Sequence, residues 1–216
     1  MVIDLPDTPR WVEAHGIASD PTSWRRELPD GFALGSDRAK LIVIAGAVAK
    51  DAVDALAREW PSHAILVGEG YGGERAILYT LPEPGALAEL EGAVLLDRDA
   101  PLDHLAPALA DELRATPERV WCAWVDELPV AFAYAPWRSA TWFDISVDVD
   151  PSARQLGLGT LVASALIHDE RSRGREAVWG ADEGNHASRA LARRLGFVEV
   201  DELWVIAPRA TQSASS

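Results

Sequence analysis

Two glycines and a row of carboxylates occupy neighbouring segments in the second half of this chain. Gly157 and Gly159 stand at the start of an amphipathic segment, residues 158–173. A helix that begins there presents unpaired N–H groups and the positive end of its dipole, and both favour anions such as a pyrophosphate. We therefore predict a phosphate-bearing ligand at the turn 152–159. A tight strand-to-helix turn without a ligand is the alternative.

Residues 141–150, the segment before this turn, alternate between apolar and polar residues. An alternation with period two is typical of a half-buried strand. Pro151 ends the strand, because proline cannot donate to a ladder. Asp144 and Asp148 share the polar face, but four residues separate them by roughly 13 Å, so they cannot share a proton. The apolar face comprises Phe143, Ile145, Val147 and Val149, and the polar face comprises Asp144, Ser146, Asp148 and Asp150.

Two other phosphate loops are excluded by the residues present. A dinucleotide fingerprint needs a third glycine where Val162 stands, and a nucleoside-triphosphate loop needs a Gly-Lys-Ser/Thr sequence that does not follow. What remains is Arg154-x-x-Gly157-x-Gly159. Downstream, Asn185 precedes a helical segment that ends in Leu195-Gly196-Phe197.

These two signatures, in this order, resemble those of the GCN5-related N-acetyltransferase (GNAT) family. The resemblance covers residues 91–207 and is strongest over 141–197. It implies an α/β (α+β) fold, a mixed and mostly antiparallel central sheet flanked by helices, with an additional N-terminal α/β segment. We divide the chain into an N-terminal α/β region of unknown role (1–85), an acetyltransferase core (86–208) and a flexible tail (209–216).

The elements expected along the chain follow from periodicity, capping residues and breakers. Thr8-Pro9 and Asp20-Pro21 each predict a short helix, one carrying Trp11 and the other Trp24. A small β-α-β unit follows. The further strands are 75–81, 93–96, 120–125, 130–135, 176–182 and 197–207, with a turn at 126–129, and the further helices are 87–90, 101–114, 158–173 and 185–196.

The family resemblance also implies acetyl-CoA as the co-substrate and places its contacts. The backbone of Val147 and Val149 would pair with the pantetheine arm, and the N–H groups of 155–160 would hold the pyrophosphate. The implied cofactor contacts are Val147, Asp148, Val149, Arg154, Gln155, Leu156, Gly157, Leu158, Gly159, Thr160, Asn185 and Ser188.

For catalysis, the family often uses a carboxylate seven residues before the proline, which is Asp144 here. A solvated or salt-bridged strand aspartate is the alternative. The tyrosine that many members carry on the last helix is replaced by Ala192. Tyr134 could serve as proton donor if it faces the cleft, although a strand tyrosine also commonly packs in a core.

Two functions follow. The first is acetyl-CoA-dependent N-acetylation of the primary amine of a small molecule or amino acid derivative by direct attack. The second is a non-catalytic acyl-CoA-binding or protein-interaction module on the same fold, which Ala192 would suit. Trp121, Trp124, Trp137 and Trp142 either line an acceptor pocket or fill the space between sheet and helices.

Composition limits the partners. A net charge of −14 and a pI near 4.7 disfavour nucleic acid and anionic membranes. Cys122 is the only cysteine, so an intrachain disulfide or cysteine metal cluster is excluded, and the histidines show no metal-ligand spacing. No apolar run is long enough for a membrane span. We expect a cytoplasmic protein without metal, and a homodimer is left open.

Overall fold

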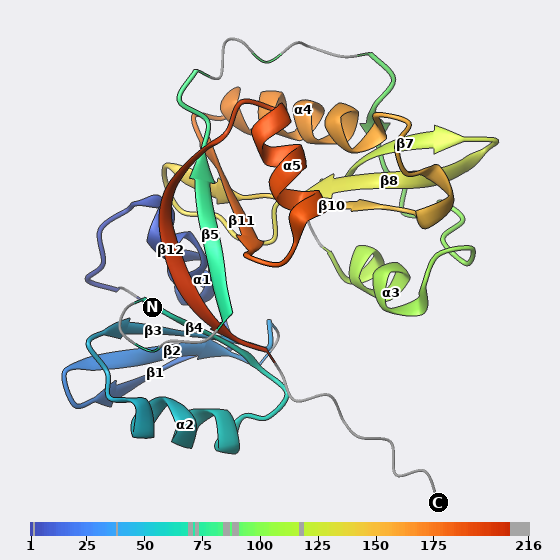
Figure 1. Ribbon diagram of the computed structural model, residues 1–216. Helices are drawn as coiled ribbons and strands as arrows, with labels where there is room; N and C mark the ends of the chain where they lie inside the picture. The colour runs from blue at the N-terminus through green and yellow to red at the C-terminus, as the bar shows by residue number, and fades with distance from the viewer. Residues whose placement is uncertain are drawn as a thin grey trace, which may run out of the picture.

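The computed structural model describes residues 1, 3–37, 39–68, 71, 74–83, 87, 91–116 and 119–207. Its strands form two sheets, one of eight strands in the order β1-β2-β3-β4-β12-β5-β11-β9 and one of four in the order β10-β8-β7-β6 (Figure 1). Most neighbouring strands are antiparallel, while β3–β4 and β9–β11 are parallel. The mixed, mostly antiparallel sheet with flanking helices that the sequence predicts is confirmed.

The strands are β1 (Ser23–Leu28), β2 (Gly31–Ser36), β3 (Leu41–Gly46), β4 (Ala64–Val67), β5 (Glu74–Thr80), β6 (Val94–Leu95), β7 (Trp121–Val125), β8 (Leu128–Tyr134), β9 (Trp142–Asp144), β10 (Ser146–Val149), β11 (Glu176–Asp182) and β12 (Val198–Ile206). The helices are α1 (Val12–Ser19), α2 (Lys50–Glu59), α3 (Pro107–Ala115), α4 (Leu158–Arg171) and α5 (His186–Arg194), with 3-10 turns η1 (Pro9–Trp11) and η3 (Pro151–Ala153).

The long strand predicted for 141–150 is wrong in one respect, because the chain changes sheets within it. β9 is the edge of the eight-stranded sheet, and β10 is the edge of the four-stranded sheet. Ile145 lies between them, and its N–H donates to Val178 O at 3.1 Å. The alternation of side chains survives this break, since Phe143 and Ile145 both lie in the core under α4.

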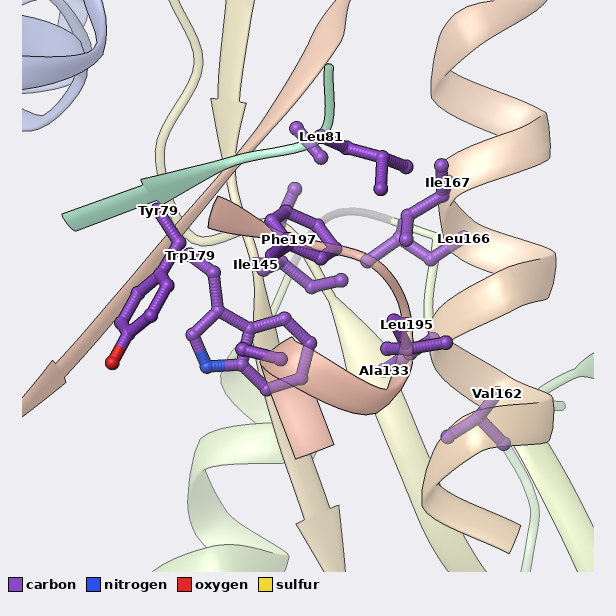
Figure 2. Close-up of a cluster of buried hydrophobic side chains, with 14 of the residues drawn as sticks. Tyr79, Leu81, Ala133, Ile145, Val162, Leu166, Ile167, Trp179, Leu195 and Phe197 are labelled. Atoms are coloured by element: carbon purple, nitrogen blue, oxygen red, sulfur yellow. The ribbon is translucent and has the colours of Figure 1, made fainter. Parts of the chain in front are cut away.

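Helices cover both faces of the sheets. α4 packs on β7, β8, β10 and β11, so it spans the two sheets (Figure 1). Figure 2 shows the core beneath it, where Leu166 and Ile167 of α4 approach Phe197, and Trp179 meets Phe197 edge-on at 5.5 Å. On the opposite face, α1 contacts β1, β2 and β9, while α3 packs on the residues of β7 and β8 that point away from α4.

The N-terminal region contains the predicted β-α-β unit, in which parallel β3 and β4 flank α2. The helix predicted after Asp20-Pro21 is wrong: the segment forms β1, which pairs with β2. Asp20 Oδ1 accepts from Thr22 N at 2.7 Å and holds a turn rather than a helix start. Trp24 then stacks on Trp60 at 5.1 Å, which fixes the strand by packing that the local sequence does not reveal.

Smaller differences concern element ends. The helix predicted from Pro101 begins at Pro107, where proline occupies a first-turn position. The hairpin turn is shorter than 126–129, because Asp126 and Glu127 adopt φ of 48° and 65° and strand β8 already starts at Leu128. Such left-handed pairs match the twist of the strands in two-residue turns. Residues 88–90 of the helix predicted at 87–90, and the tail 209–216, lie outside the described residues.

The closing strand β12 connects the two parts of the large sheet, because it pairs with β4 on one side and with β5 on the other. Arg10 reinforces this junction with a bidentate ion pair to Asp201 and a hydrogen bond to Gly68 O. The eight-stranded sheet therefore draws strands from both sides of residue 85. The division into 1–85, 86–208 and 209–216 stays a prediction.

A buried carboxylate fixes the end of α4. Glu170 is 1% exposed and accepts from Arg138 at 2.8 Å and Arg175 at 2.7 Å, so it ties α4 to the segments that follow β8 and precede β11. At the same end of the helix, Arg171 and Glu176 form an exposed pair at 3.3 Å.

We expect Glu170→Ala to lower the free energy of unfolding by about 3 kcal/mol, because it leaves two partly buried guanidinium groups without their shared partner. Glu176→Ala removes the exposed pair and should cost less than about 1 kcal/mol. Urea denaturation of both variants checks this. Equal losses would show that the Glu170 network does not hold this end of α4.

Candidate active site

A groove of about 710 Å³ opens between β10, the turn that follows it, and α5. The backbone turn 153–160 forms one wall, and the face of α5 with Trp179 behind it forms the other. Its lining residues are Val147, Asp148, Val149, Ala153, Arg154, Gln155, Gly157, Leu158, Gly159, Thr160, Trp179, Asn185, Ala187, Ser188, Ala190, Leu191 and Arg194.

The structure brings together in this groove nearly all of the cofactor positions expected from the sequence. The exception is Leu156, which is 61% exposed and is not part of the lining. Leu156 lies between Gln155 and Gly157, whose φ angles of 65° and 80° are left-handed. A tight turn of this kind sends neighbouring side chains in different directions, so the spacing of the motif could not show which one faces the groove.

The N-terminus of α4 has the geometry of an anion site. Gly157 is its N-cap with φ of 80°, and no side chain caps the helix. The N–H of Leu161 bonds to Gly157 O, whereas the amides of the preceding turn have no partner within the helix. With the dipole directed at the same place, this end of α4 suits a phosphate group.

The two glycines of the motif have different physical roles. A Cβ at Gly157 would meet no atom within 4 Å, so its left-handed φ, not lack of space, requires glycine there. At Gly159 the backbone is helical, but a Cβ would lie 3.2 Å from Leu191 Cδ2 and 3.4 Å from Val149 Cγ2. Gly159 thus lets α4 approach α5 and β10 closely, at the inner end of the groove.

The division between the two sheets leaves backbone groups available beside the groove. β10 pairs with β8 on one side, and no described strand pairs with its other side. β11 pairs with β9 only as far as Val178, although it continues to Asp182. Free N–H and C=O groups of β10 can therefore bond an extended chain lying in the groove, as a further strand would.

Two arginines supply positive charge to the groove. Arg154 was expected from the motif, whereas Arg194 was not among the expected cofactor contacts. Neither makes a side-chain hydrogen bond or ion pair to another residue in the part of the chain that the structure describes. The neighbouring Arg189 and Arg193, by contrast, bond to Glu199.

Asn185 and Ser188 line the groove but also have structural partners. Asn185 Oδ1 accepts from Ser188 N at 3.1 Å, which confirms Asn185 as the N-cap of α5. The Ser188 hydroxyl accepts from Trp179 Nε1 at 2.9 Å and keeps its own proton to donate. Their role toward a cofactor stays a prediction.

Asp144 lies on the face of the sheet opposite α4, and α1 packs against it there. Asp144 pairs in register with Val178, and Val178 packs against Val12, the residue beside Glu13 of α1. Burial raises the pKa of Asp144 well above its ordinary value, the charge of Glu13 raises it further, and the N–H of Ile145 opposes both. Burial also raises the pKa of Glu13, to about 7.

Glu13 was missed by sequence reasoning. Its neighbours Val12, Ala14 and Ile17 are fully buried, and Glu13 itself is 9% exposed, so it belongs to the buried side of α1. A single carboxylate on the apolar side of a predicted helix is a usable signal. Its partner, however, stands 131 positions later in the sequence and is brought near only by the packing of α1 on β9.

Tyr134 is 2% exposed and lies on the same face of the sheets as Asp144. Its hydroxyl lies 2.8 Å from Glu112 Oε1 of α3 and 3.2 Å from Asp148 Oδ2 of β10. Burial raises the pKa of the phenol, which weakens it as an acid. Burial also raises the pKa of Asp148, and Glu112 adds to that effect while the phenol opposes it.

The degree of burial of Ala192 and of the four tryptophans shows how each of them is placed. Ala192, at the place of the family tyrosine, is fully buried in the core beneath α4. Trp137 and Trp142 pack around α1, Trp121 packs on the α4 core, and Trp124 is 39% exposed. The packing alternative therefore holds for Trp121, Trp137 and Trp142 but not for the exposed Trp124.

Comparison with known proteins identifies the family. Residues 88–197 match the profile of the Acetyltransferase (GNAT) family, and this span is more than half of the 216 residues. The chain belongs to the GNAT acetyltransferase family. No protein of curated function matches its sequence.

Solved GNAT structures share the whole fold at low identity. An acetyltransferase of the GNAT family from Novosphingobium aromaticivorans has a TM-score of 0.63 at 16% identity over 94% of this chain and 98% of its own. A GCN5-related N-acetyltransferase from Kribbella flavida gives 0.64 at 16% over 95% and 96%. A GCN5-related N-acetyltransferase-like protein from Streptococcus suis gives 0.61 at 17% over 93% of both chains.

The described residues hold neither a metal-type cluster of side chains nor a membrane-spanning helix. No group of histidine, cysteine, aspartate and glutamate side chains there has the arrangement of a metal site. None of the described helices combines the length and apolar character that crossing a bilayer requires.

We expect Gly157→Ala to lower the free energy of unfolding by about 1–2 kcal/mol, because an L side chain is disfavoured at left-handed φ. Gly174 provides a matched control: it has φ of 82°, no atom lies within 4 Å of its added Cβ, and it follows the other end of α4. Gly174→Ala should cost the same amount. Thermal or urea denaturation of both variants measures it, and a far larger loss at Gly157 would show tight packing there.

Proposed function

We propose that the protein transfers an acetyl group from acetyl-CoA to the primary amine of a small molecule or amino acid derivative, by direct attack. The observation that carries this proposal is the uncapped N-terminus of α4, which faces a groove bordered by the free edge of β10 and by Arg154 and Arg194, neither of which has a side-chain hydrogen bond or ion pair among the described residues. These features suit the pyrophosphate, the amide-containing arm and the further phosphate of coenzyme A.

When bound, acetyl-CoA supplies the thioester that is attacked. The free backbone groups of β10 would hold its arm, and the α4 amides with Arg154 or Arg194 would hold its phosphates. Asp148 would lie beside the arm, since it belongs to the groove lining. The chain thus fixes the position of the reacting carbonyl mainly through backbone contacts.

The amine must reach the carbonyl without its extra proton, because a protonated amine has no lone pair. Asp144 is the proposed base, and its raised pKa makes it a stronger proton acceptor than an ordinary aspartate. Asp148 and Glu112 add negative charge on the same face. This acidic surrounding supports an amine that arrives as a cation.

Return of a proton to the departing thiolate is assigned to Tyr134 or to water. The hydroxyl of Tyr134 reaches Asp148, which lines the groove, but the raised pKa of the phenol makes it a weak donor. Because Ala192 is buried where many relatives have a tyrosine, a non-catalytic acyl-CoA-binding or protein-interaction module is the second candidate. Cytoplasmic location and a homodimer stay predictions.

Calorimetric titration with acetyl-CoA tests the cofactor. We expect the parent and Gly174→Ala to bind equally, and Gly157→Ala to bind several-fold more weakly, because only Gly157 shapes the anion-binding turn. Arg194→Ala should weaken binding by roughly tenfold, the loss of one charge-assisted phosphate contact. Absence of binding by the folded parent would refute the proposed co-substrate.

We expect Asp144→Asn to lower kcat at neutral pH by at least about a hundredfold, the usual contribution of a general base, with little effect on acetyl-CoA affinity. Release of free thiol from acetyl-CoA in a panel of primary amines measures the rate. An unchanged kcat would remove Asp144 as the base. Thiol release with any amine would exclude the non-catalytic alternative.

A further inference from the structure

The N-terminal helix α1 brings a second carboxyl group to the proposed base. Val12 and Val178 belong to one buried cluster, Val178 is the register partner of Asp144, and α1 contacts β9, so Glu13 and Asp144 lie on the two sides of the contact between α1 and β9. Gly16 lets α1 approach the segment before β9 closely, because a Cβ there would lie 2.6 Å from Trp137 Cε3, and Trp137 O accepts from the N–H of Asp144 at 3.0 Å.

Glu13 lacks the partner that a buried charge needs. It is 9% exposed, and no other side chain donates a hydrogen bond to it or forms an ion pair with it in the described ranges. An isolated ionised carboxylate in such a place is costly, so buried carboxyls are usually paired or carry a proton. Asp144 is more accessible than Glu13, being only partly buried.

Nearby cations do not neutralise the two groups, because each is paired elsewhere. The charged side chains on the elements around α1 and β9 are engaged as follows. The Met1 ammonium bonds to Ala18 O, Arg10 bonds to Asp201, Asp7 accepts from Thr141, His15 contacts Pro6 O, Arg25 bonds to Glu27, Arg26 to Glu59, Arg138 to Glu170, and Glu176 of β11 pairs with Arg171. Strand β2 carries no charged residue.

We propose that Glu13 and Asp144 hold one proton between them and accept the proton of the incoming amine as a unit. Asp144, the accessible member, meets the substrate, and Glu13 acts through it as a positioning residue. This rests on the proposed function for its substrate, and it adds a residue outside the span that matches the family profile, 88–197.

The proton balance is as follows. The ammonium R–NH3⁺ gives one proton to the singly charged pair, which becomes neutral. The amine lone pair then forms the C–N bond, and the C–S bond breaks. The second nitrogen proton goes to the thiolate, and the third stays on the amide. The pair returns its proton to water. Because the two carboxyl groups share one proton, one carboxylate stays available near neutral pH. The apolar contact between α1 and β9 then does not hold two negative charges.

The pair can be observed directly by NMR titration of ¹³C-labelled carboxyl groups. We expect Glu13→Gln to lower the titration midpoint of the Asp144 carboxyl group by about one pH unit or more. Because coupling between two sites is reciprocal, Asp144→Asn should also lower the titration midpoint of Glu13. Glu127→Gln removes an exposed carboxylate at the hairpin turn and should change neither midpoint. Unchanged midpoints in both variants would overturn the proposal.

Activity gives a second reading of the same variants. We expect the acidic limb of kcat/KM to move to lower pH in Glu13→Gln by about the shift seen in the titration, with Glu13→Asp intermediate. A fall in rate without movement of the limb would mean that Glu13 acts only through structure, and would overturn the proposal. If no amine is acetylated, the proposed function fails, while the NMR result still decides whether the proton is shared.

Stability provides a test that needs neither label nor substrate. The pKa of Glu13 is about 7 in the folded chain against an ordinary value of 4.5, so the folded chain binds more protons than the unfolded chain between these values. Stability therefore falls as pH rises through this window. We expect Glu13→Gln to flatten the fall measured by urea denaturation, and an equal slope in parent and variant would contradict a proton held at this site.

Discussion

The separation of β9 from β10 at Ile145 is the feature on which the site depends. The N–H of Ile145 stays bonded to β11 while the residues after it join a different sheet. A continuous strand would have paired with β11 along its length and closed the groove. Because α4 packs on both sheets, the separation is held open by a core rather than by loops.

The same separation organises the two faces. On one face, α4, whose N-cap is Gly157, meets α5. This face presents backbone N–H groups without a partner in the helix and cationic side chains. On the other face, Glu112 of α3 and Asp148 of β10 bond to Tyr134, and the charge of Glu13 of α1 raises the pKa of Asp144 of β9. Positive groups and carboxyl groups are thus placed on opposite sides of one short stretch of backbone.

Sequence reasoning located most of the groove because its residues are close in the chain. Gly157, Gly159 and the Asn185 cap carry local conformational requirements that a motif expresses. What it missed depends on distant packing: Trp24 is held in a strand by Trp60, the sheet change at Ile145 leaves the alternation intact, and Glu13 meets Asp144 through α1. The position of Arg194 in the groove depends on the orientation of α5, which capping residues alone do not predict.

The position of β12 has a consequence for synthesis of the chain. β4 and β5 belong to the first half of the sequence, yet the strand that lies between them is residues 198–206. Until the ribosome has released that segment, β4 lacks a neighbour on one side and β5 has an unpaired edge, which are surfaces that promote association between chains. Completion of the large sheet is thus a late and non-local event, and such events slow folding.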